Sequence, residues 1–116
     1  MNQTSNRPPI QQIRWTDRTA IVDVAGDIDL SHSVDFQQQL LTLLDQKPQR
    51  IVVNLAQVPY MDSSGVASLV KVLSRARKIN ATLFLVGLTA RVKSLFEITR
   101  LDSVFSIKGT EQEAMA

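Results

Sequence analysis

The sequence predicts an α/β fold in which a mixed, mostly parallel β-sheet is packed with three to four helices. Residues 50–55 and 82–86 are nearly continuous apolar runs, which are typical of strands buried on both faces. Apolar residues recur at helical spacing in residues 33–46 and 64–78. Because strands alternate with helices along the chain, we expect parallel pairing through right-handed crossovers.

The first two strands are predicted to form a hairpin. Residues 10–16 alternate loosely and contain an aromatic side chain, as an edge strand does, and residues 19–24 are rich in β-branched side chains. Residues 17–18 between them fit a tight turn. The N-terminal strand should therefore be an antiparallel edge of the sheet, and residues 25–30 should end the second strand and turn the chain.

A helix is expected over residues 33–46, with Ser31 or Ser33 as its N-cap. Pro48 helps to end it. Helical spacing groups its apolar side chains on one face, which should point into the core. This face consists of Phe36, Leu40, Leu43 and Leu44.

The second helix is expected over residues 64–78, after a short loop that contains Pro59. Its apolar stripe is predicted to consist of Val66, Leu69, Val70 and Leu73. Its basic residues fall mostly off that stripe and should face solvent, which makes a nucleic-acid surface unnecessary to explain them. They are Lys71, Arg75, Arg77 and Lys78.

The C-terminal third is predicted to repeat the alternation. Strand 82–86 is followed by a helix over residues 90–99 and by a short last strand over residues 104–107. Residues 110–116 should add a turn of helix or fray. The inward side chains of the third helix are expected to be Val92, Leu95, Phe96 and Ile98.

Size and composition fit one globular domain. The chain has 116 residues, of which 44% are hydrophobic and 21% charged, with 13 basic and 11 acidic side chains. We expect a flexible tail over residues 1–9 and a single domain over residues 10–116. The chain has no cysteine, which is compatible with the cytoplasm, and its apolar runs are far shorter than the roughly 20 residues of a membrane span. The expected location is cytoplasmic, without contact to membrane or nucleic acid.

Two acidic loops follow strands of the predicted sheet. Gly26-Asp27-Ile28-Asp29 follows the second strand, and Tyr60-Met61-Asp62-Ser63-Ser64-Gly65 follows the third. Ligands of open α/β sheets gather at the carboxyl ends of the parallel strands, and both loops should lie there. If the two strands are neighbours, Asp27 or Asp29 should lie near Ser63.

The second loop has two interpretations. In the structural one, Asp62 or Ser63 caps the helix, which contributes about 1 kcal/mol, and Gly65 lets the helix start lie close to the sheet. In the functional one, the hydroxyl of Ser63 accepts a phosphate, which adds roughly −1.5 to −2 charges. The helix N-terminus would partly accommodate that charge while Asp27, Asp29 and Asp62 oppose it, so that the fold persists and its face changes. The residues alone leave both interpretations open.

Catalysis is not supported by the side chains near this loop. Ser63 as a nucleophile would need a base, and His32 is the only histidine. The surrounding residues are not Gly-x-Ser-x-Gly, and the chain has no Gly-Lys-Ser/Thr phosphate loop. Carboxylates near Ser63 could hold Mg²⁺, but nothing else completes such a site. We therefore expect a protein that is not an enzyme and has no catalytic residue, metal or cofactor.

Residues 58–70 (Val-Pro-Tyr-Met-Asp-Ser-Ser-Gly-Val-Ala-Ser-Leu-Val) closely resemble the signature of bacterial anti-sigma factor antagonists, the single-domain STAS proteins. Further similar segments occur in order, at compatible spacing. They are residues 26–29, which look like the family's Gly-Glu-Leu-Asp segment, residues 51–55 before the signature, and residues 86–96 at the later strand–helix turn. The resemblance covers nearly the whole chain and implies a STAS-like fold.

The resemblance also implies partner switching. In this family the unmodified antagonist binds an anti-sigma factor that is a serine kinase, is phosphorylated by it and released, and is reset by a serine phosphatase. The serine directly after the aspartate, here Ser63, would be the phosphoacceptor. Asp29 would be the acidic residue beside Ser63. The flanking, partner-binding positions would be Asp27, Asp62, Ser64 and Gly65. Asp27 stands where Glu is common, and Arg100 replaces a frequent glycine, which leaves the partner's identity open.

Two other functions compete with this interpretation. An accessory STAS subunit of a lipid-transport ATP-binding cassette complex would dock constitutively, and retention of Ser63 disfavours it because such a subunit needs no phosphoacceptor. A nucleotide-binding module or hydrolase is disfavoured by the missing phosphate loop and bases. We expect a monomer or a weak dimer.

Overall fold

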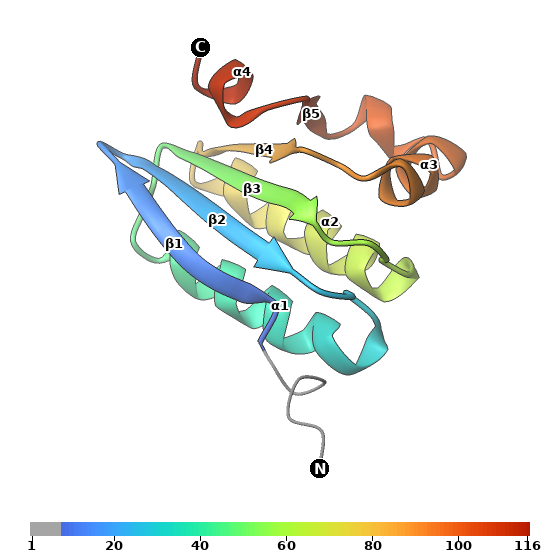
Figure 1. Cartoon of the computed structure of the whole chain (residues 1–116). Coiled ribbons are helices and arrows are strands. Elements are labelled where there is room, and N and C mark those ends of the chain that lie inside the picture. The colour runs from blue at the N-terminus through green and yellow to red at the C-terminus, as the bar shows by residue number, and fades with distance from the viewer. Residues whose placement is uncertain (1–7) are drawn as a thin grey trace.

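The computed structural model describes residues 8–116, so most of the tail expected over residues 1–9 lies outside the described residues. The predicted domain limits at 10 and 116 stay a prediction. The described chain forms a five-stranded sheet in the order β1-β2-β3-β4-β5 (Figure 1). Its strands are β1 (Ile10–Thr16), β2 (Thr19–Ala25), β3 (Arg50–Gln57), β4 (Thr82–Val86) and β5 (Ser106–Lys108).

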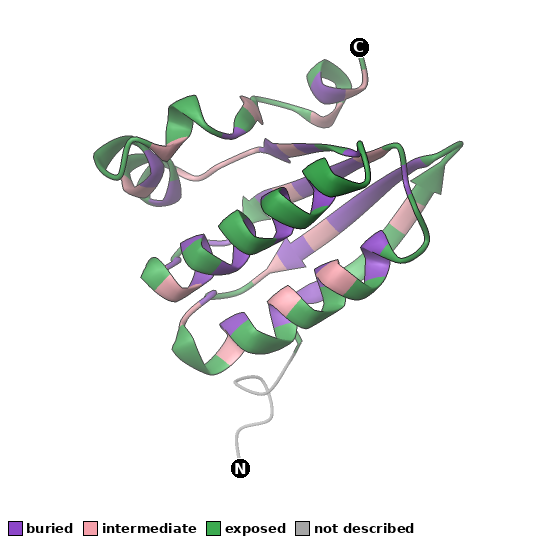
Figure 2. Ribbon diagram, turned by 180° about the vertical axis from the view of Figure 1, so that it is seen from behind, coloured by how far each residue is buried: buried purple, intermediate pink, exposed green. Residues whose placement is uncertain are grey.

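The helices lie on both faces of this sheet. α1 and α2 run side by side across one face and begin at the same end of it, whereas α4 lies on the other face (Figures 1 and 2). The helical segments are α1 (Leu30–Leu44), α2 (Ser63–Lys78), α3 (Ala90–Ile98), the 3₁₀ helix η2 (Leu101–Ser103) and α4 (Glu111–Met115).

The pairing of the strands confirms the predicted fold class. β1 pairs with β2 in antiparallel fashion, with Thr16 opposite Thr19 and Asp17 at a φ of 54° in the turn. β2, β3, β4 and β5 are all parallel to their neighbours. The carboxyl ends of β2 and β3 therefore meet at one edge of the sheet, beside the N-termini of α1 and α2.

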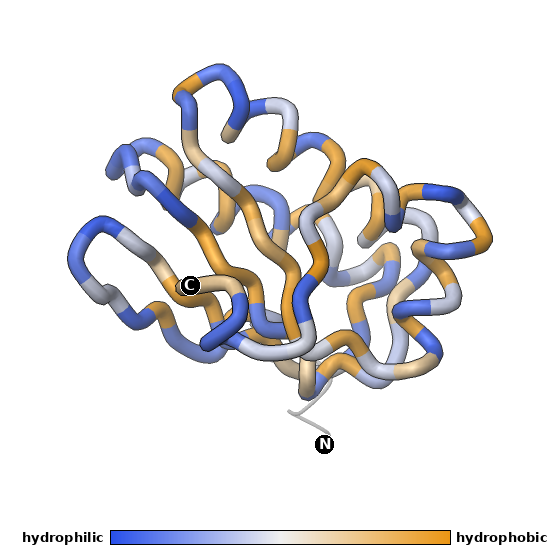
Figure 3. The backbone as a smooth tube through the Cα atoms, turned by 90° about the horizontal axis from the view of Figure 1, so that it is seen from above, coloured by the Kyte–Doolittle hydropathy of each residue, from blue (hydrophilic) through white to orange (hydrophobic). Residues whose placement is uncertain are grey.

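The main core lies between the sheet and the two long helices. Phe36 and Leu40 of α1 and Leu69 of α2 are completely buried against the strands. On the other face, Ile21 and Val52 form a smaller cluster with Val86 and Ala114, under α4. The central strands are correspondingly apolar along most of their length, whereas the helices alternate between hydrophobic and hydrophilic residues (Figure 3).

The start of α1 differs from the prediction. Asp29 is the N-cap, and its carboxylate accepts a hydrogen bond from the backbone N–H of Ser31 at 3.1 Å, so that the helix begins at Leu30. Ser33, the other expected cap, is buried inside the helix. Its carbonyl accepts a hydrogen bond from the hydroxyl of Ser68 in α2 at 3.1 Å.

Two apolar residues expected in the core are exposed. Val70 is 41% and Ile98 is 80% accessible to solvent. On α2 the buried sector instead includes Val72 and Ala76, since the sheet covers a face centred on these positions. The pattern located the stripe of each helix, but the neighbouring elements decide how wide a stripe is covered.

The chain after α3 also differs from the prediction. η2 occupies part of the expected last strand, and β5 is shifted to Ser106–Lys108. Phe105 is 4% exposed and contacts the ring of Phe96 edge to face, with centroids 5.4 Å apart. The contact between these two rings accounts for the turn before β5.

Within residues 8–116, no helix combines the length and the apolar character that crossing a bilayer requires.

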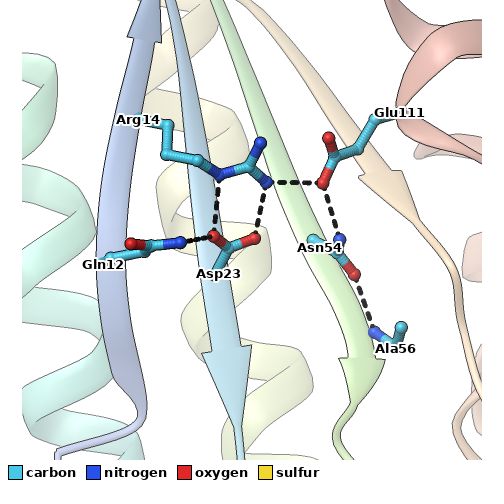
Figure 4. A network of polar contacts seen from close by, with 6 residues as sticks. All are labelled: Gln12, Arg14, Asp23, Asn54, Ala56 and Glu111. Atoms are coloured by element: carbon cyan, nitrogen blue, oxygen red, sulfur yellow. Dashed lines mark hydrogen bonds and ion pairs between the residues drawn. The ribbon is translucent and has the colours of Figure 1, made fainter.

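The C-terminal segment forms a short helix, as one of the two expected outcomes. A polar network on the sheet holds it in place (Figure 4). Arg14 of β1 contacts Asp23 of β2 at 2.8 Å and Glu111 of α4 at 2.6 Å. Glu111 also accepts a hydrogen bond from the Asn54 amide at 2.7 Å. Three strands and α4 are thus connected by one set of charge-assisted contacts.

Replacing Glu111 by glutamine should lower the free energy of unfolding at pH 7 by about 1 kcal/mol or less, because Arg14 is partly solvated. Hydrogen bonding to Arg14 lowers the pKa of both Glu111 and Asp23. A lowered carboxyl pKa stabilises the fold above the unfolded-state value, about 4.3 for Glu, and this contribution is lost as pH falls through the folded-state pKa. Urea unfolding should therefore show the difference at pH 7 and a smaller one near pH 3.

The matched control is Glu97→Gln on α3, whose side chain is exposed and contacts no described residue by an ion pair. Its unfolding should be unchanged at both pH values. The ion-pair explanation would be contradicted if the Glu111 variant and the unmodified protein differed as much in their free energy of unfolding near pH 3 as at pH 7.

Candidate functional site

The two acidic loops lie against each other at the carboxyl ends of β2 and β3. Ile28 and Met61 form a parallel bridge between them. The N–H of Ile28 donates to the carbonyl of Tyr60 at 3.0 Å, and the N–H of Asp62 donates to the carbonyl of Ile28 at 3.2 Å. These backbone bonds extend the pairing of β2 and β3 into the loops and fix the starts of α1 and α2 relative to each other.

Both helices begin with the same local arrangement. Asp29 caps α1 and accepts hydrogen bonds from the N–H of Ser31 at 3.1 Å and from its hydroxyl at 2.7 Å. Asp62 caps α2 and accepts from the N–H of Ser64 at 2.9 Å and from its hydroxyl at 2.5 Å. Each pattern is Asp-x-Ser, and the residue between Asp and Ser is the first one of the helix.

These hydrogen bonds keep both capping carboxylates ionised. The hydroxyl of Ser64 lowers the pKa of Asp62, with further contributions from the backbone N–H groups of Ser64, Gly65 and Leu30. The hydroxyl of Ser31 lowers the pKa of Asp29, followed by the ring of His32. Because the N–H of Leu30 acts on Asp62, the cap of α2 also lies beside the start of α1.

The two adjacent serines of the motif differ in their contacts. Ser63 is exposed at the first position of α2, and no described residue makes a hydrogen bond with its hydroxyl. Ser64 is half-buried, and its hydroxyl is held by Asp62. The cap expected of Asp62 or Ser63 is therefore Asp62, which leaves the hydroxyl of Ser63 accessible.

Gly65 lies where the two loops come closest. A Cβ atom at this position would stand 2.6 Å from Cγ of Met61, 2.8 Å from Cγ2 of Ile28 and 3.1 Å from the carbonyl oxygen of Ile28. These separations are shorter than van der Waals contact, so only glycine fits without displacing its neighbours. The close approach of helix and sheet expected at this residue is present.

The two acidic residues of the first loop, Asp27 and Asp29, form no hydrogen bond with Ser63 in the described chain. Asp27 is exposed and follows Gly26, which has a φ of 86°. Asp29 binds Ser31 and the Nδ1 atom of His32, the latter at 2.9 Å. His32 thus lies on the first turn of α1 beside the cap. In the described part of the chain, no group of three or more His, Cys, Asp and Glu residues is placed to hold a metal ion.

The N-terminus of α3 borders the site on the other side. The hydroxyl of Thr89 donates to the carbonyl of Val58 at 2.9 Å, which ties this helix start to the loop after β3. The guanidinium of Arg91 lies over the ring of Tyr60, 5.7 Å from its centroid. Sequence reasoning did not include Tyr60 and Arg91 as partners, because the pair joins segments that are far apart in the chain.

Sequence reasoning also missed two exposed apolar residues beside the motif, Leu30 and Val34. A signal for Leu30 was present, since it follows the capping Asp29 as Ser63 follows Asp62. The sequence pattern places Leu30 in the turn before the helix, and its exposure becomes visible only in the structure.

Comparisons with known proteins agree with this architecture. The family model described as STAS domain matches residues 11–114. An anti-sigma-B factor antagonist from Staphylococcus aureus (strain NCTC 8325 / PS 47) is 36% identical over 94 residues, which cover 79% of this chain and 86% of that protein.

Two solved structures resemble the fold. An anti-sigma factor antagonist from Mycobacterium paratuberculosis has a TM-score of 0.82 at 21% identity, covering 90% of this chain and 88% of that chain. The Bacillus cell fate determinant SpoIIAA in its phosphorylated form has a TM-score of 0.69 at 21% identity, covering 90% of this chain and 95% of that chain. At this identity the likeness establishes a common fold.

Proposed function

This chain belongs to the STAS domain family, and from that premise we propose that it is an anti-sigma factor antagonist whose binding is controlled by phosphorylation of Ser63. In its unmodified form it binds an anti-sigma factor that is also a serine kinase, and it is released when that kinase phosphorylates it. A serine phosphatase restores the binding form. The protein acts by binding and is not itself an enzyme.

The observation that carries this proposal is the contrast between the two serines. A kinase needs a hydroxyl that can reach the γ-phosphate of ATP and that is not held by a neighbouring side chain. Ser63 meets this requirement because it is exposed and makes no hydrogen bond with a described residue, whereas Ser64 is bound to Asp62. The geometry therefore supports Ser63 over Ser64 as the phosphoacceptor.

The surroundings of Ser63 support a switch that leaves the fold intact. The phosphate would lie outside the core, at a helix N-terminus whose dipole favours negative charge. The ionised Asp62, and Asp29 on the adjoining loop, would add like charge nearby. We infer that modification changes the electrostatics and shape of this face while the sheet and helices persist.

Phosphorylation with labelled ATP and the cognate serine-kinase anti-sigma factor tests the proposal. Ser63→Ala should lose essentially all incorporated phosphate, because the acceptor oxygen is gone, and should still bind the kinase. Ser64→Ala is the matched control, since it removes the neighbouring hydroxyl and keeps Ser63. It should be phosphorylated, with a stability loss of at most about 1 kcal/mol from the weakened cap.

Phosphopeptide mass spectrometry identifies the modified residue in each variant. Undiminished phosphorylation of the Ser63→Ala variant at another position would overturn the assignment. Stable binding of a transport ATPase that is indifferent to Ser63 would instead favour the accessory transporter subunit.

A further inference from the structure

The first turns of α1 present an apolar surface that the fold leaves uncovered. Leu30 is 75% and Val34 is 63% accessible to solvent. They lie one turn apart and therefore on the same side of α1. Because Ser33 contacts Ser68 of α2, helical periodicity places this side along the border between α1 and α2.

This apolar surface adjoins Ser63. Leu30 occupies in α1 the position that Ser63 occupies in α2, directly after the capping aspartate. The backbone N–H of Leu30 acts on the carboxylate of Asp62, the residue before Ser63. Leu30 and Ser63 are thus the neighbouring first residues of two helices whose starts are bound together through Ile28.

Four carboxylates lie at the same end of the molecule as the apolar surface. Asp27, Asp29, Asp35 and Asp62 all lie in the loops or first turns at this end of the molecule, and none of them forms an ion pair with a Lys or Arg of the described residues. Among the basic residues near these two helices, Lys71 lies in the middle of α2. The others lie toward the opposite end, and they are Lys47, which follows α1, and Arg75, Arg77 and Lys78 in the last turns of α2. Arg91 and Lys93 in the first turn of α3 also border the end with the carboxylates, and the guanidinium of Arg91 lies over the ring of Tyr60. The four carboxylates outnumber these two cations, so that end has a net negative charge.

We propose that Leu30 and Val34 are the anchor by which the unphosphorylated protein binds its kinase, and that the kinase receives them in an apolar pocket with Lys and Arg side chains at its rim. The assignment rests on the proposed function and names the contact residues and the chemistry of the partner surface. Central apolar side chains within a polar rim are the usual anatomy of such an interface. Because the four carboxylates at this end of the molecule have no Lys or Arg partner among the described residues, they favour positive charge at the rim of the partner's pocket.

The same charges disfavour other occupants. A two-fold interface centred on Leu30 would bring Asp27, Asp29 and Asp62 of one copy toward the same carboxylates of the other, and like charges at an interface are unfavourable. A membrane surface that carries anionic lipids would be repelled for the same reason. A partner with an apolar pocket and a basic rim complements both Leu30 and Val34 and the carboxylates near them.

Titration calorimetry of the unphosphorylated protein with the cognate serine-kinase anti-sigma factor tests the anchor. The double variant Leu30→Ser, Val34→Ser should bind about 30-fold more weakly or worse, because the two central apolar contacts are lost. Ile98→Ser is the matched control, since Ile98 is 80% exposed but lies on α3, and it should bind within about twofold of the unmodified protein. Circular dichroism should give the same spectrum and melting temperature for all three proteins.

Phosphorylation kinetics separate this role from that of Ser63. An anchor contributes to binding but not to phosphate transfer, so the double variant should have a raised KM and an unchanged kcat. Raising NaCl from about 50 mM to about 500 mM should weaken binding of the unmodified protein, since the rim charges are screened. Asp27→Asn should reduce that salt dependence.

The outcomes distinguish the anchor from the proposed function. Tight binding and normal KM in the double variant, with the unmodified protein phosphorylated at Ser63, would overturn the anchor alone. Absence of binding and phosphorylation in the unmodified protein would remove the proposed function and the anchor with it. Sedimentation of the unmodified protein as a dimer that Leu30→Ser, Val34→Ser dissociates would overturn the anchor in favour of a second copy as occupant.

Discussion

Under the proposed function, the protein phosphorylated at Ser63 should bind the ADP-loaded serine-kinase anti-sigma factor at least about 100-fold more weakly than the unmodified protein does. The hydroxyl of Ser63 must face the terminal phosphate of ATP for transfer, so the phosphoserine that results faces the remaining phosphates of ADP. Like charges enclosed in an interface cost several kcal/mol, and each 1.4 kcal/mol corresponds to about a tenfold change in affinity. Titration calorimetry with the phosphorylated and unmodified proteins measures the difference.

Two substitutions of nearly equal size separate charge from shape at this position. Ser63→Asp introduces a single negative charge and should weaken binding about tenfold, less than the phosphate with its roughly −1.5 to −2 charges. Ser63→Asn has the same shape without the charge and should stay within about threefold of the unmodified protein. Equal losses in both variants would mean that bulk at the helix start, rather than charge, blocks the complex.

The thermal stability of the phosphorylated protein is the second part of this expectation. The phosphate would extend into solvent from an exposed position at the N-terminus of α2, so the melting temperature should change by only a few degrees. A large drop in melting temperature would indicate that modification unfolds the helix start. The switch would then act through local unfolding.

Replacing Gly65 by valine should destabilise the protein by about 1–3 kcal/mol and disturb the helix start that carries Ser63. The added Cβ would stand 2.6 Å from Met61 and 2.8 Å from Ile28, and both of these residues are buried. Relief would require the two loops to separate, which weakens the backbone hydrogen bonds of Ile28 with Tyr60 and Asp62. Urea unfolding gives the stability, and kinase binding at a temperature where the variant is folded gives the effect on the site.

Gly109→Val is the matched control for this prediction. The atom closest to a Cβ at Gly109 is the carboxylate end of the exposed Glu113 side chain, at 2.9 Å. This side chain can turn away only by giving up the hydrogen bonds that it accepts from the N–H groups of Gly109 and Thr110, a cap contribution of about 1 kcal/mol. The stability loss should therefore be clearly smaller than at Gly65, and kinase binding should be unchanged. Equal losses at the two positions would contradict the view that close contact between the loops makes Gly65 necessary.

The alternation of strand and helix patterns was sufficient to predict the sheet, its antiparallel first strand and the identity of most core residues. These predictions depend on local spacing, since a buried strand needs a continuous apolar run and a surface helix needs one apolar face. Phe36 and Leu40 are completely buried as expected. Element boundaries were less accurate, because Ser31, Ser33 and Asp29 are all good caps and only the backbone geometry selects Asp29.

The candidate site was located by the motif, but its working parts depend on contacts between segments distant in the chain. Asp62 holds Ser64 through a local contact that the backbone geometry of the cap selects, whereas its position beside the first residue of α1 joins distant segments. Local spacing does not indicate that Leu30 and Val34 stay uncovered, because that depends on where α2 and the sheet end. Periodicity along the chain therefore specifies the layers and most of the core. The placement of the free serine beside the apolar surface arises only when two helix starts are brought together by parallel strands.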